Sequence, residues 1–465
     1  MSKSYIFYLI ISSVFLCALA FHKIVVKMTI MKKLPELLAP AGTLDAFKTA
    51  ILYGADAIYA GLPGFSMRAR AKIDVDGVRA GIEFAHAHGK RVYLAFNLFA
   101  HDRDFDNMPR VREIIEYLQP DALIVADAGV LTWVRENFPN MPIHISTQAN
   151  ICSAASVKFW KNAGASLCVL AREVSHPEFC SIRKQCPDIK LEIFVHGAMC
   201  MAYSGRCLLS NYITGRPSNR GACAQLCRWK YDVILREKES GIEMPIDEDD
   251  RGAYILNSKD LCLMPRLAEV LASAPDSLKI EGRNRSEYYV GSVVRAYRNA
   301  MDAWARDPAN FDPTPFMADL NVLETRGYTT AFFDGGLPAT AHDFDTTKSD
   351  SMYHAAGVVT EVTAQFLGHS PSFTASAEKK GGTGAAGGAV VLELRNEIRA
   401  GDEITFLLPR DKFTIKLDKI INAKNGDELP KMSAGQGNSI LIPCNKIPAQ
   451  YLPQMQEYIL AYKHK

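Results

Sequence analysis

The chain has 465 residues, which is too long for one typical domain and predicts two or three. Apolar residues make up 48% of it and charged residues 22%, which is typical of a soluble globular protein rather than of a disordered chain. The net charge of +2 is too small to indicate a partner through overall electrostatics.

The first 33 residues form an apolar N-terminal extension. Residues 5–21 are almost wholly apolar, with Lys3 before them and Lys23 after them. This pattern is open to three interpretations: a cleaved signal peptide, a membrane anchor, or a start codon assigned too far upstream. We favour the third, because Met28 and Met31 both precede the point where the globular pattern begins. We therefore expect a cytoplasmic protein without stable membrane association; export or anchoring through residues 5–21 is the alternative.

From residue 34 to 286, short apolar runs alternate with stretches of helical periodicity. Near-continuous apolar runs of this length are typical of strands buried on both faces, and strand–helix alternation predicts a parallel sheet. Eight or nine runs favour a (β/α)₈ TIM-like barrel over a doubly wound open sheet. The runs are PELLAPAG (35–42), ADAIYAG (55–61), RVYLAFN (91–97), ALIVADAG (122–129), IHISTQAN (143–150), CVLARE (168–173), LEIFVHG (191–197), YILNSKD (254–260) and SLKIEGR (277–283).

Three further segments complete the predicted organisation. A long insertion, residues 197–254, interrupts the barrel after the seventh run. Residues 287–350 are predicted to be a helical and loop-like bridge. Residues 351–435 contain short alternating strands separated by turn residues, which predict a small C-terminal antiparallel β-barrel followed by a tail, residues 436–465.

Polar residues gather where the predicted strands end, and in a barrel this end carries the active site. They are Asn97, Asp127, Gln148, Asn150, Arg172, Glu173, His196, Lys259, Asp260, Glu281 and Arg283. A structural explanation is also available, because loops, and therefore polar residues, begin at these points.

The cysteines are the strongest chemical signal. Five of the 11 lie between residues 200 and 262, at Cys200, Cys207, Cys223, Cys227 and Cys262. Four thiolates suffice for a [4Fe–4S] cluster or a structural zinc. Only Cys223 and Cys227 form the close pair that is usual in zinc sites, so the spacing favours a cluster; zinc or free buried thiols are the alternatives. With five candidates for four positions, one is expected not to be a ligand.

The insertion is also basic and aromatic, which suits phosphate contacts and base stacking. A solvated loop, or positive charge that balances the thiolates, is the alternative. The candidate RNA-binding residues are Arg206, Arg216, Arg220, Arg228, Trp229 and Lys230. The sequence contains no zincin, nucleophile-elbow or Walker motif, so no hydrolase signature is visible.

The stretch EIFVHGAMCMAYSGRCLLSNYITGRPSNRGACAQLCRWKY, residues 192–231, resembles the signature of the peptidase U32 family, which is also called collagenase-like. PELLAPAGTLDAFKTAILYGADAIYAG, SLKIEGRNRSEYY and RGYTTAFF resemble the family in the same order. With its C-terminal β-barrel, the chain is most similar to the subgroup of prephenate-dependent hydroxylases that make 5-hydroxyuridine at tRNA position 34.

The resemblance implies an iron–sulfur enzyme that hydroxylates the wobble uridine of tRNA. It implies cluster ligands at Cys200, Cys207, Cys223 and Cys262, with Cys227 as an alternative ligand. Prephenate, as a dicarboxylate, would require an arginine clamp. Arg68, Arg172 and Arg283 are the candidates. Proteolysis by a U32-type peptidase, and a non-catalytic cluster-binding scaffold, are the alternative functions.

Overall fold

The computed structural model describes residues 34–63, 73–200, 202–203, 206–216, 218, 222–228, 234–236, 243–245, 258–336, 351–363, 388–435 and 437–465. The apolar extension lies outside these residues. Within the described part of the chain, no helix combines the length and the apolar character that crossing a membrane requires.

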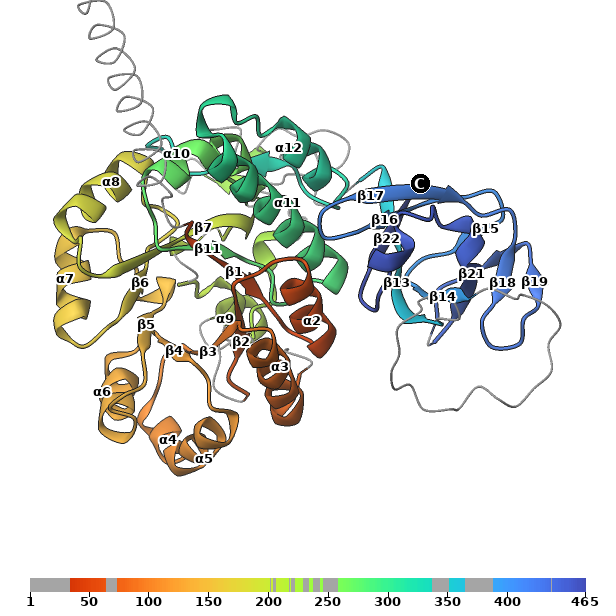
Figure 1. Cartoon of the computed structure of the whole chain (residues 1–465). Helices are drawn as coiled ribbons and strands as arrows, with labels where there is room; N and C mark the ends of the chain where they lie inside the picture. Colours follow the sequence, from red (N-terminus) through yellow and green to blue (C-terminus); the bar gives the residue numbers. More distant parts are fainter. Residues whose placement is uncertain are drawn as a thin grey trace, which may run out of the picture.

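Eight parallel strands form a closed barrel, so the predicted (β/α)₈ fold is confirmed (Figure 1). The strands pair in chain order and the last one, β11, pairs with both β1 and β7, which closes the sheet. The strands are β1 (Glu36–Pro40), β2 (Ala57–Gly61), β3 (Arg91–Phe96), β4 (Ala122–Val125), β5 (Ile143–Ile145), β6 (Leu167–Val169), β7 (Lys190–Ala198) and β11 (Ser277–Ile280).

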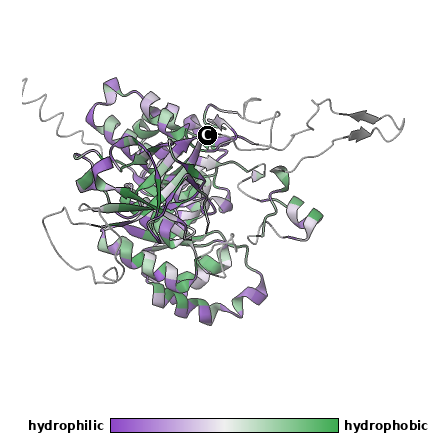
Figure 2. Cartoon of the chain, turned by 90° about the vertical axis from the view of Figure 1, so that its right-hand side faces the viewer, coloured by the Kyte–Doolittle hydropathy of each residue, from purple (hydrophilic) through white to green (hydrophobic). Residues whose placement is uncertain are grey.

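Burial on both faces explains why these runs are almost continuously apolar. Every residue of β2 and of β4 is buried. Leu38, Tyr59, Tyr93 and Ile124 belong to a small cluster inside the barrel, whereas the alternate residues join a larger core beneath the helices. Figure 2 shows this green, apolar interior with purple, polar residues on the outer helical surfaces.

The helices surround the barrel, and several begin at a side-chain cap. Thr43 caps the first of them by accepting a hydrogen bond from the Ala46 amide, and Ser175 and Glu178 form a reciprocal capping box. The helices are α2 (Leu44–Leu52), α3 (Val75–Ala87), α4 (Asp102–Phe105), α5 (Met108–Leu118), α6 (Ala128–Asn137), α7 (Ala154–Asn162), α8 (His176–Gln185), α10 (Leu267–Ala272), α11 (Glu287–Arg306) and α12 (Thr314–Leu320).

One predicted barrel strand is wrong. The run at residues 254–260 was expected to join the parallel barrel, but its described end belongs to β10 (Asp260–Cys262), which pairs antiparallel with the extension of β7. β10 also pairs with β12 (Tyr328–Thr329). This small extension of the sheet lies beside the barrel instead of within its wall, because β7 is nine residues long and continues past the barrel rim.

The segment predicted as a bridge begins with α11, which packs against β1 and α2 and shares the core of the barrel. α11 is a 20-residue helix with one broad buried face. It therefore completes the ring of helices around the barrel.

The C-terminal part is an antiparallel half-barrel of eight strands around a core of its own. Its described strands run in the order β17 (Lys412–Lys416), β16 (Glu403–Leu407), β22 (Leu460–His464), β13 (Tyr353–Val362), β14 (Ala389–Leu394), β21 (Ser439–Pro443), β18 (Ile420–Asn422) and β19 (Glu428–Leu429). A further pair joins β15 (Ile398–Arg399) to β20 (Lys431–Met432). Two of the eight strands, β21 and β22, come from the segment predicted as a tail.

The half-barrel is fixed to the barrel by buried polar contacts. The Tyr53 hydroxyl donates to the Leu407 carbonyl oxygen at 2.5 Å and accepts from the Leu460 amide at 2.9 Å. Arg295 on α11 donates to the carbonyl oxygens of Leu408 and Asp411 at 2.7 and 3.0 Å. These bonds satisfy backbone groups that are buried between the two parts.

Candidate functional site

The carboxyl ends of the barrel strands form a charged mouth. Arg172 follows β6, and its Nη2 lies 3.2 Å from Oε2 of Glu281, which follows β11. Both side chains are only 10% exposed. Arg283, two residues further along, is also buried. Two of the three predicted clamp arginines therefore lie at the barrel mouth, and Arg68 lies outside the described residues.

Cations and aromatic rings alternate below this mouth. The Arg172 guanidinium lies 4.0 Å from the Phe194 ring centroid, and the Lys279 ammonium lies 5.6 Å from the same ring. Lys279 is also 4.4 Å from the Tyr59 ring centroid, and Arg283 is 5.7 Å from it. Cation–π attraction at these distances links the three cations through two rings. These three cations and two rings, here called the cation ladder, place positive charge at the centre of the barrel mouth.

Lys279, the middle cation of the cation ladder, also forms a buried ion pair. Lys279 Nζ donates to Glu192 Oε1 at 2.8 Å, and the Ser277 hydroxyl donates to Oε2 of the same carboxylate at 2.8 Å. The Lys279 and Glu192 side chains are 6% and 1% exposed. With Glu192 and Glu281 counted against the three cations, the group carries one net positive charge. An anionic ligand is therefore favoured at the mouth.

Two glycines allow the β11 loop to approach the neighbouring strands. A Cβ on Gly42 would lie 2.0 Å from the Arg283 carbonyl oxygen. Gly197 has φ of +116°, and a Cβ there would lie 2.3 Å from the Glu281 carbonyl oxygen. Only glycine fits such contacts, so these positions fix where the Arg283 and Glu281 side chains emerge.

Residues that follow β3 and β5 connect the mouth to the insertion. Asn97, after β3, donates to the Ser146 hydroxyl at 3.2 Å. Gln148 lies in the short helical turn after β5, and its backbone carbonyl oxygen accepts two hydrogen bonds from the Arg206 guanidinium, at 3.2 and 2.9 Å. The Arg206 guanidinium also lies 5.6 Å from the Phe99 ring. Arg206 therefore holds the start of the insertion against the barrel mouth.

Not every polar residue at a strand end faces the mouth. Asp127 caps α6 by accepting from the amides of Gly129 and Val130 at 2.8 and 3.0 Å, which is a structural role. His196 is 1% exposed and lies near the rings of Tyr289 and Tyr297 on α11, because the register shifts just before it. Burial lowers the pKa of His196 to about 4, so its imidazole is neutral.

The five candidate cysteines are not joined in disulfides, so their thiol chemistry suits a metal or a cluster. Cys262 is the most buried. Its Sγ lies 3.9 Å from the Tyr297 hydroxyl and 3.8 Å from Met317 Sδ, and burial raises the pKa of the thiol to about 11. A thiolate at this position would need a strong positive partner such as a metal centre.

Cys207 and Cys223 lie on neighbouring segments of the insertion. The Ser218 hydroxyl donates to the Cys207 carbonyl oxygen, and the Ala224 amide donates to the Ser210 hydroxyl at 2.9 Å. The Arg216 guanidinium lies 3.4 Å from the Cys223 carbonyl oxygen and donates to it.

Cys200 follows the end of β7 and is partly buried, as is Cys227 in the turn at Leu226–Arg228. In the part of the chain that the structure describes, no three His, Cys, Asp or Glu side chains are arranged to hold a metal ion. Thiols are the side chains that a cluster requires, but the described residues do not bring three of them together at one point.

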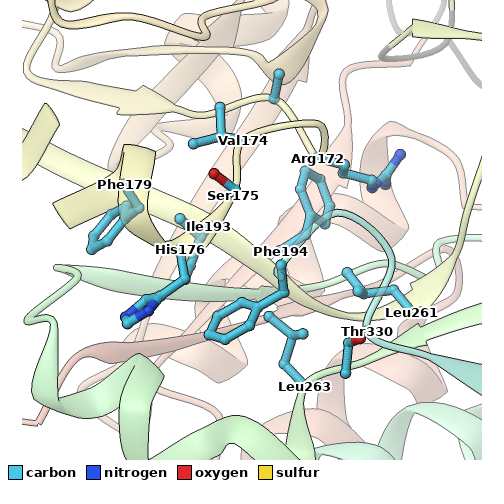
Figure 3. A pocket seen from close by; sticks show the side chains of 12 residues that line it. Arg172, Val174, Ser175, His176, Phe179, Ile193, Phe194, Leu261, Leu263 and Thr330 are labelled. Atoms are coloured by element: carbon cyan, nitrogen blue, oxygen red, sulfur yellow. The ribbon is translucent and has the colours of Figure 1, made fainter. Parts of the chain in front are cut away.

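An apolar pocket adjoins the mouth at Arg172 (Figure 3). In this view Arg172 and Thr330 lie at the opposite end of the lining from Phe179 and His176. The other lining residues are Ala171, Val174, Ser175, Ile193, Phe194, Leu261, Leu263 and Phe333. Arg172 therefore joins an apolar pocket to a cationic mouth, which is an arrangement that suits a small apolar acid.

The structure also brings together a thiol and an imidazole that the sequence did not single out. The Cys180 Sγ lies 3.5 Å from His176 Nε2, one turn apart on α8. The His176 ring stacks on Phe333 with 4.8 Å between the centroids, and both residues line the pocket. A helical i, i+4 spacing is the signal that could have identified this pair.

Two of the six predicted RNA-binding residues have described side chains, Arg206 and Arg216. Both lie on the insertion; Arg206 is exposed along part of its length and contacts the Gln148 backbone oxygen at the mouth. Arg220, Trp229, Lys230 and the side chain of Arg228 lie outside the described residues.

Comparison with known proteins identifies relatives over most of the chain. The family model described as peptidase family U32 matches residues 42–343. The tRNA hydroxylation protein P of Escherichia coli K12 is 37% identical over 449 residues, covering 88% of this chain and 93% of the relative. The tRNA hydroxylation protein P1 of Bacillus subtilis 168 is 34% identical, covering 86% and 90%. The 23S rRNA 5-hydroxycytidine C2501 synthase of E. coli K12 is 34% identical, covering 70% of this chain and 46% of the relative.

Proposed function

The chain belongs to peptidase family U32, and we propose that it is an enzyme that hydroxylates tRNA, with the wobble uridine as its target and 5-hydroxyuridine as its product. The relatives named for tRNA hydroxylation span nearly the whole chain, including the half-barrel. The observation that carries the proposal is the cationic mouth of the barrel, with a basic, aromatic insertion fixed to its rim through Arg206.

The mouth suits a base that has left its stack. An anticodon base is single-stranded, so extruding it costs little free energy. Positive charge at Arg172, Lys279 and Arg283 would attract the neighbouring phosphates, because the group carries a net charge of +1.

Prephenate is the proposed co-substrate, and Arg172 and Arg283 are its proposed clamp. Arginine binds carboxylates through two parallel hydrogen bonds, and two arginines match two carboxylates. Of the Arg172 donors, Nη2 lies toward Glu281, which fixes the orientation of the guanidinium. The apolar pocket beside Arg172 would receive the ring of such an acid.

A [4Fe–4S] cluster is the proposed cofactor, with Cys200, Cys207, Cys223 and Cys262 as ligands, Cys227 as the alternative ligand and zinc as the alternative metal. A bound cluster would supply one-electron transfer or hold the substrate. What supports this is the number of cysteines in and beside the insertion that are not joined in disulfides, together with the burial of Cys262. Anaerobically purified protein should be brown and contain iron and sulfide. A colourless protein that contains zinc would overturn the assignment.

The function is tested by expressing the chain in a bacterial strain that lacks its own tRNA uridine hydroxylation. Mass spectrometry of nucleosides from its tRNA should then detect 5-hydroxyuridine or its derivatives. This gain of product avoids masking by a redundant pathway. If the chain is expressed, contains its cluster and adds no 5-hydroxyuridine, the proposal fails.

Proteolysis is a second candidate because one specific contact favours it. The Cys180 thiol and the His176 imidazole, 3.5 Å apart beside a pocket, have the spacing of a nucleophile and its base. Degradation of a collagen peptide by the purified protein, abolished in Cys180→Ser and retained in Cys152→Ser, would favour this function. Degradation that persists in Cys180→Ser would exclude this pair as its source.

A further inference from the structure

The insertion carries an unusually exposed apolar surface around α9 (Leu209–Thr214). Tyr212 is 88% exposed, Leu208 is 72%, Tyr203 is 60% and Ile213 is 50%. These four residues, here called the α9 platform, make up more than half of the large apolar side chains that stand exposed among the described residues. Exposed apolar residues gathered in one segment indicate an interaction site.

The exposed face of α9 is not the face by which the helix is attached. Leu208 and Tyr212 are four residues apart, so they lie on one side of the helix. Ser210 lies on the opposite side, is 2% exposed, and accepts a hydrogen bond from the Ala224 amide at 2.9 Å. The platform therefore faces outward while Ser210 fixes the helix from behind.

The charge around the platform identifies the class of partner. Arg206 and Arg216 flank α9, and no acidic residue occurs between Glu192 and Asp232. Arg206 also reaches the Gln148 carbonyl at the barrel mouth, so the platform begins beside the site. Aromatic rings set between cations without acids suit a polyanion with flat, apolar faces, which is a single-stranded nucleic acid.

We propose that the α9 platform binds the unpaired nucleotides that flank the target base, by stacking bases on Tyr212 and packing them on Leu208. The inference rests on the proposed function, because it places the platform beside the mouth that would receive the base. A duplex offers no free base faces, so the platform should discriminate in favour of single-stranded loops. Arg216 supplies phosphate contact and Tyr212 supplies stacking.

The test is fluorescence anisotropy with the full chain and two RNA probes, a hairpin with a single-stranded loop and a fully paired duplex. Tyr212→Ala should weaken hairpin binding about 5-fold or more, which is the loss that one base stack produces. The salt dependence of hairpin binding should be the same for Tyr212→Ala as for the wild type, because this substitution removes no charge. Arg216→Met should instead lower the salt slope by about one.

Two variants serve as controls, one that keeps an aromatic ring at position 212 and one that removes an exposed ring elsewhere. Tyr212→Trp should bind the hairpin at least as tightly as the wild type does, because an indole stacks at least as well as a phenol. Phe159→Ala removes a ring that is 63% exposed on α7, away from the insertion, and should leave binding unchanged.

Three outcomes would overturn the platform. If Tyr212→Ala binds the hairpin as tightly as the wild type does, no base stacks on this ring and the proposal is refuted. An equal loss of hairpin and duplex binding would also refute stacking on unpaired bases. Sedimentation that shows a wild-type dimer becoming a monomer in Tyr212→Ala, with RNA affinity unchanged, would make the surface a protein interface. If the platform fails while the wild type still hydroxylates tRNA, the proposed function stands; if the wild type binds no RNA, both fall.

Discussion

Substitutions of Arg172 and Glu281 should change the affinity for a dicarboxylate in opposite directions. The two side chains lie 3.2 Å apart and are 10% exposed, so the Glu281 carboxylate competes with any anion that approaches Arg172. A ligand carboxylate on the guanidinium would lie roughly 6 Å from that of Glu281. At an effective dielectric of about 20, two like charges at this separation repel by about 2 to 3 kcal/mol.

Glu281→Gln removes this repulsion and keeps an amide oxygen for Arg172, so prephenate should bind at least about 10-fold more tightly. Arg172→Met removes a charge-assisted hydrogen bond worth about 1.5 to 3 kcal/mol, so binding should weaken about 10- to 100-fold. Isothermal titration calorimetry measures both, with melting temperatures confirming that each variant is folded. If Glu281→Gln weakens binding, or if neither variant changes it, Arg172 is not part of an anion clamp.

Three further predictions concern the fold and the cofactor. Tyr53→Phe should lower the free energy of unfolding by about 2 to 5 kcal/mol in a denaturant titration, because two buried backbone groups of the half-barrel lose their partner. Tyr117→Phe, on the exposed surface, is the control and should lower it by less than about 0.5 kcal/mol. Burial, together with nearby positive charges, lowers the pKa of His144 to about 3, so below pH 6.5 the unfolded chain binds a proton that the folded chain does not. The free energy of unfolding should therefore fall as the pH drops from 6.5 towards 3. His144→Gln should flatten that decline in a series of melting temperatures, and an unchanged slope would contradict the prediction. Cys262→Ser should lose most bound iron in anaerobic purification while Cys227→Ser keeps the wild-type content; equal loss in both would remove the distinction between ligand and spare cysteine.

The barrel could be predicted because a strand that is buried on both faces has a recognisable local sequence pattern. β2 and β4 are apolar at every position or nearly so, and such runs separated by helical stretches admit few topologies. The direction of a strand relative to its neighbours has no such sequence pattern. The run that ends at Asp260 resembles the others, yet it pairs antiparallel with β7, because the partner extends beyond the barrel wall.

The place of two candidate arginines in the fold could be predicted for a related reason, and their role stays a prediction. Arg172 and Arg283 follow barrel strands, and the shared orientation of parallel strands brings them to one mouth. His196 also ends a strand, but the register shift before it turns the ring towards α11, and a bulge cannot be located from an apolar run. Lys279 and Phe194 were missed, although the alternation of inward-facing residues along β7 and β11 contained the signal.

The most direct test of the central claim compares tRNA from cells that express different forms of the chain in the strain without its own uridine hydroxylation. The measurement is the ratio of 5-hydroxyuridine to unmodified uridine at the wobble position. The wild type and Arg112→Met, which changes an exposed arginine on α5, should give the same ratio, and Arg172→Met should reduce it at least about 10-fold. Full hydroxylation by a folded Arg172→Met variant would contradict the assignment of the reaction to the barrel mouth.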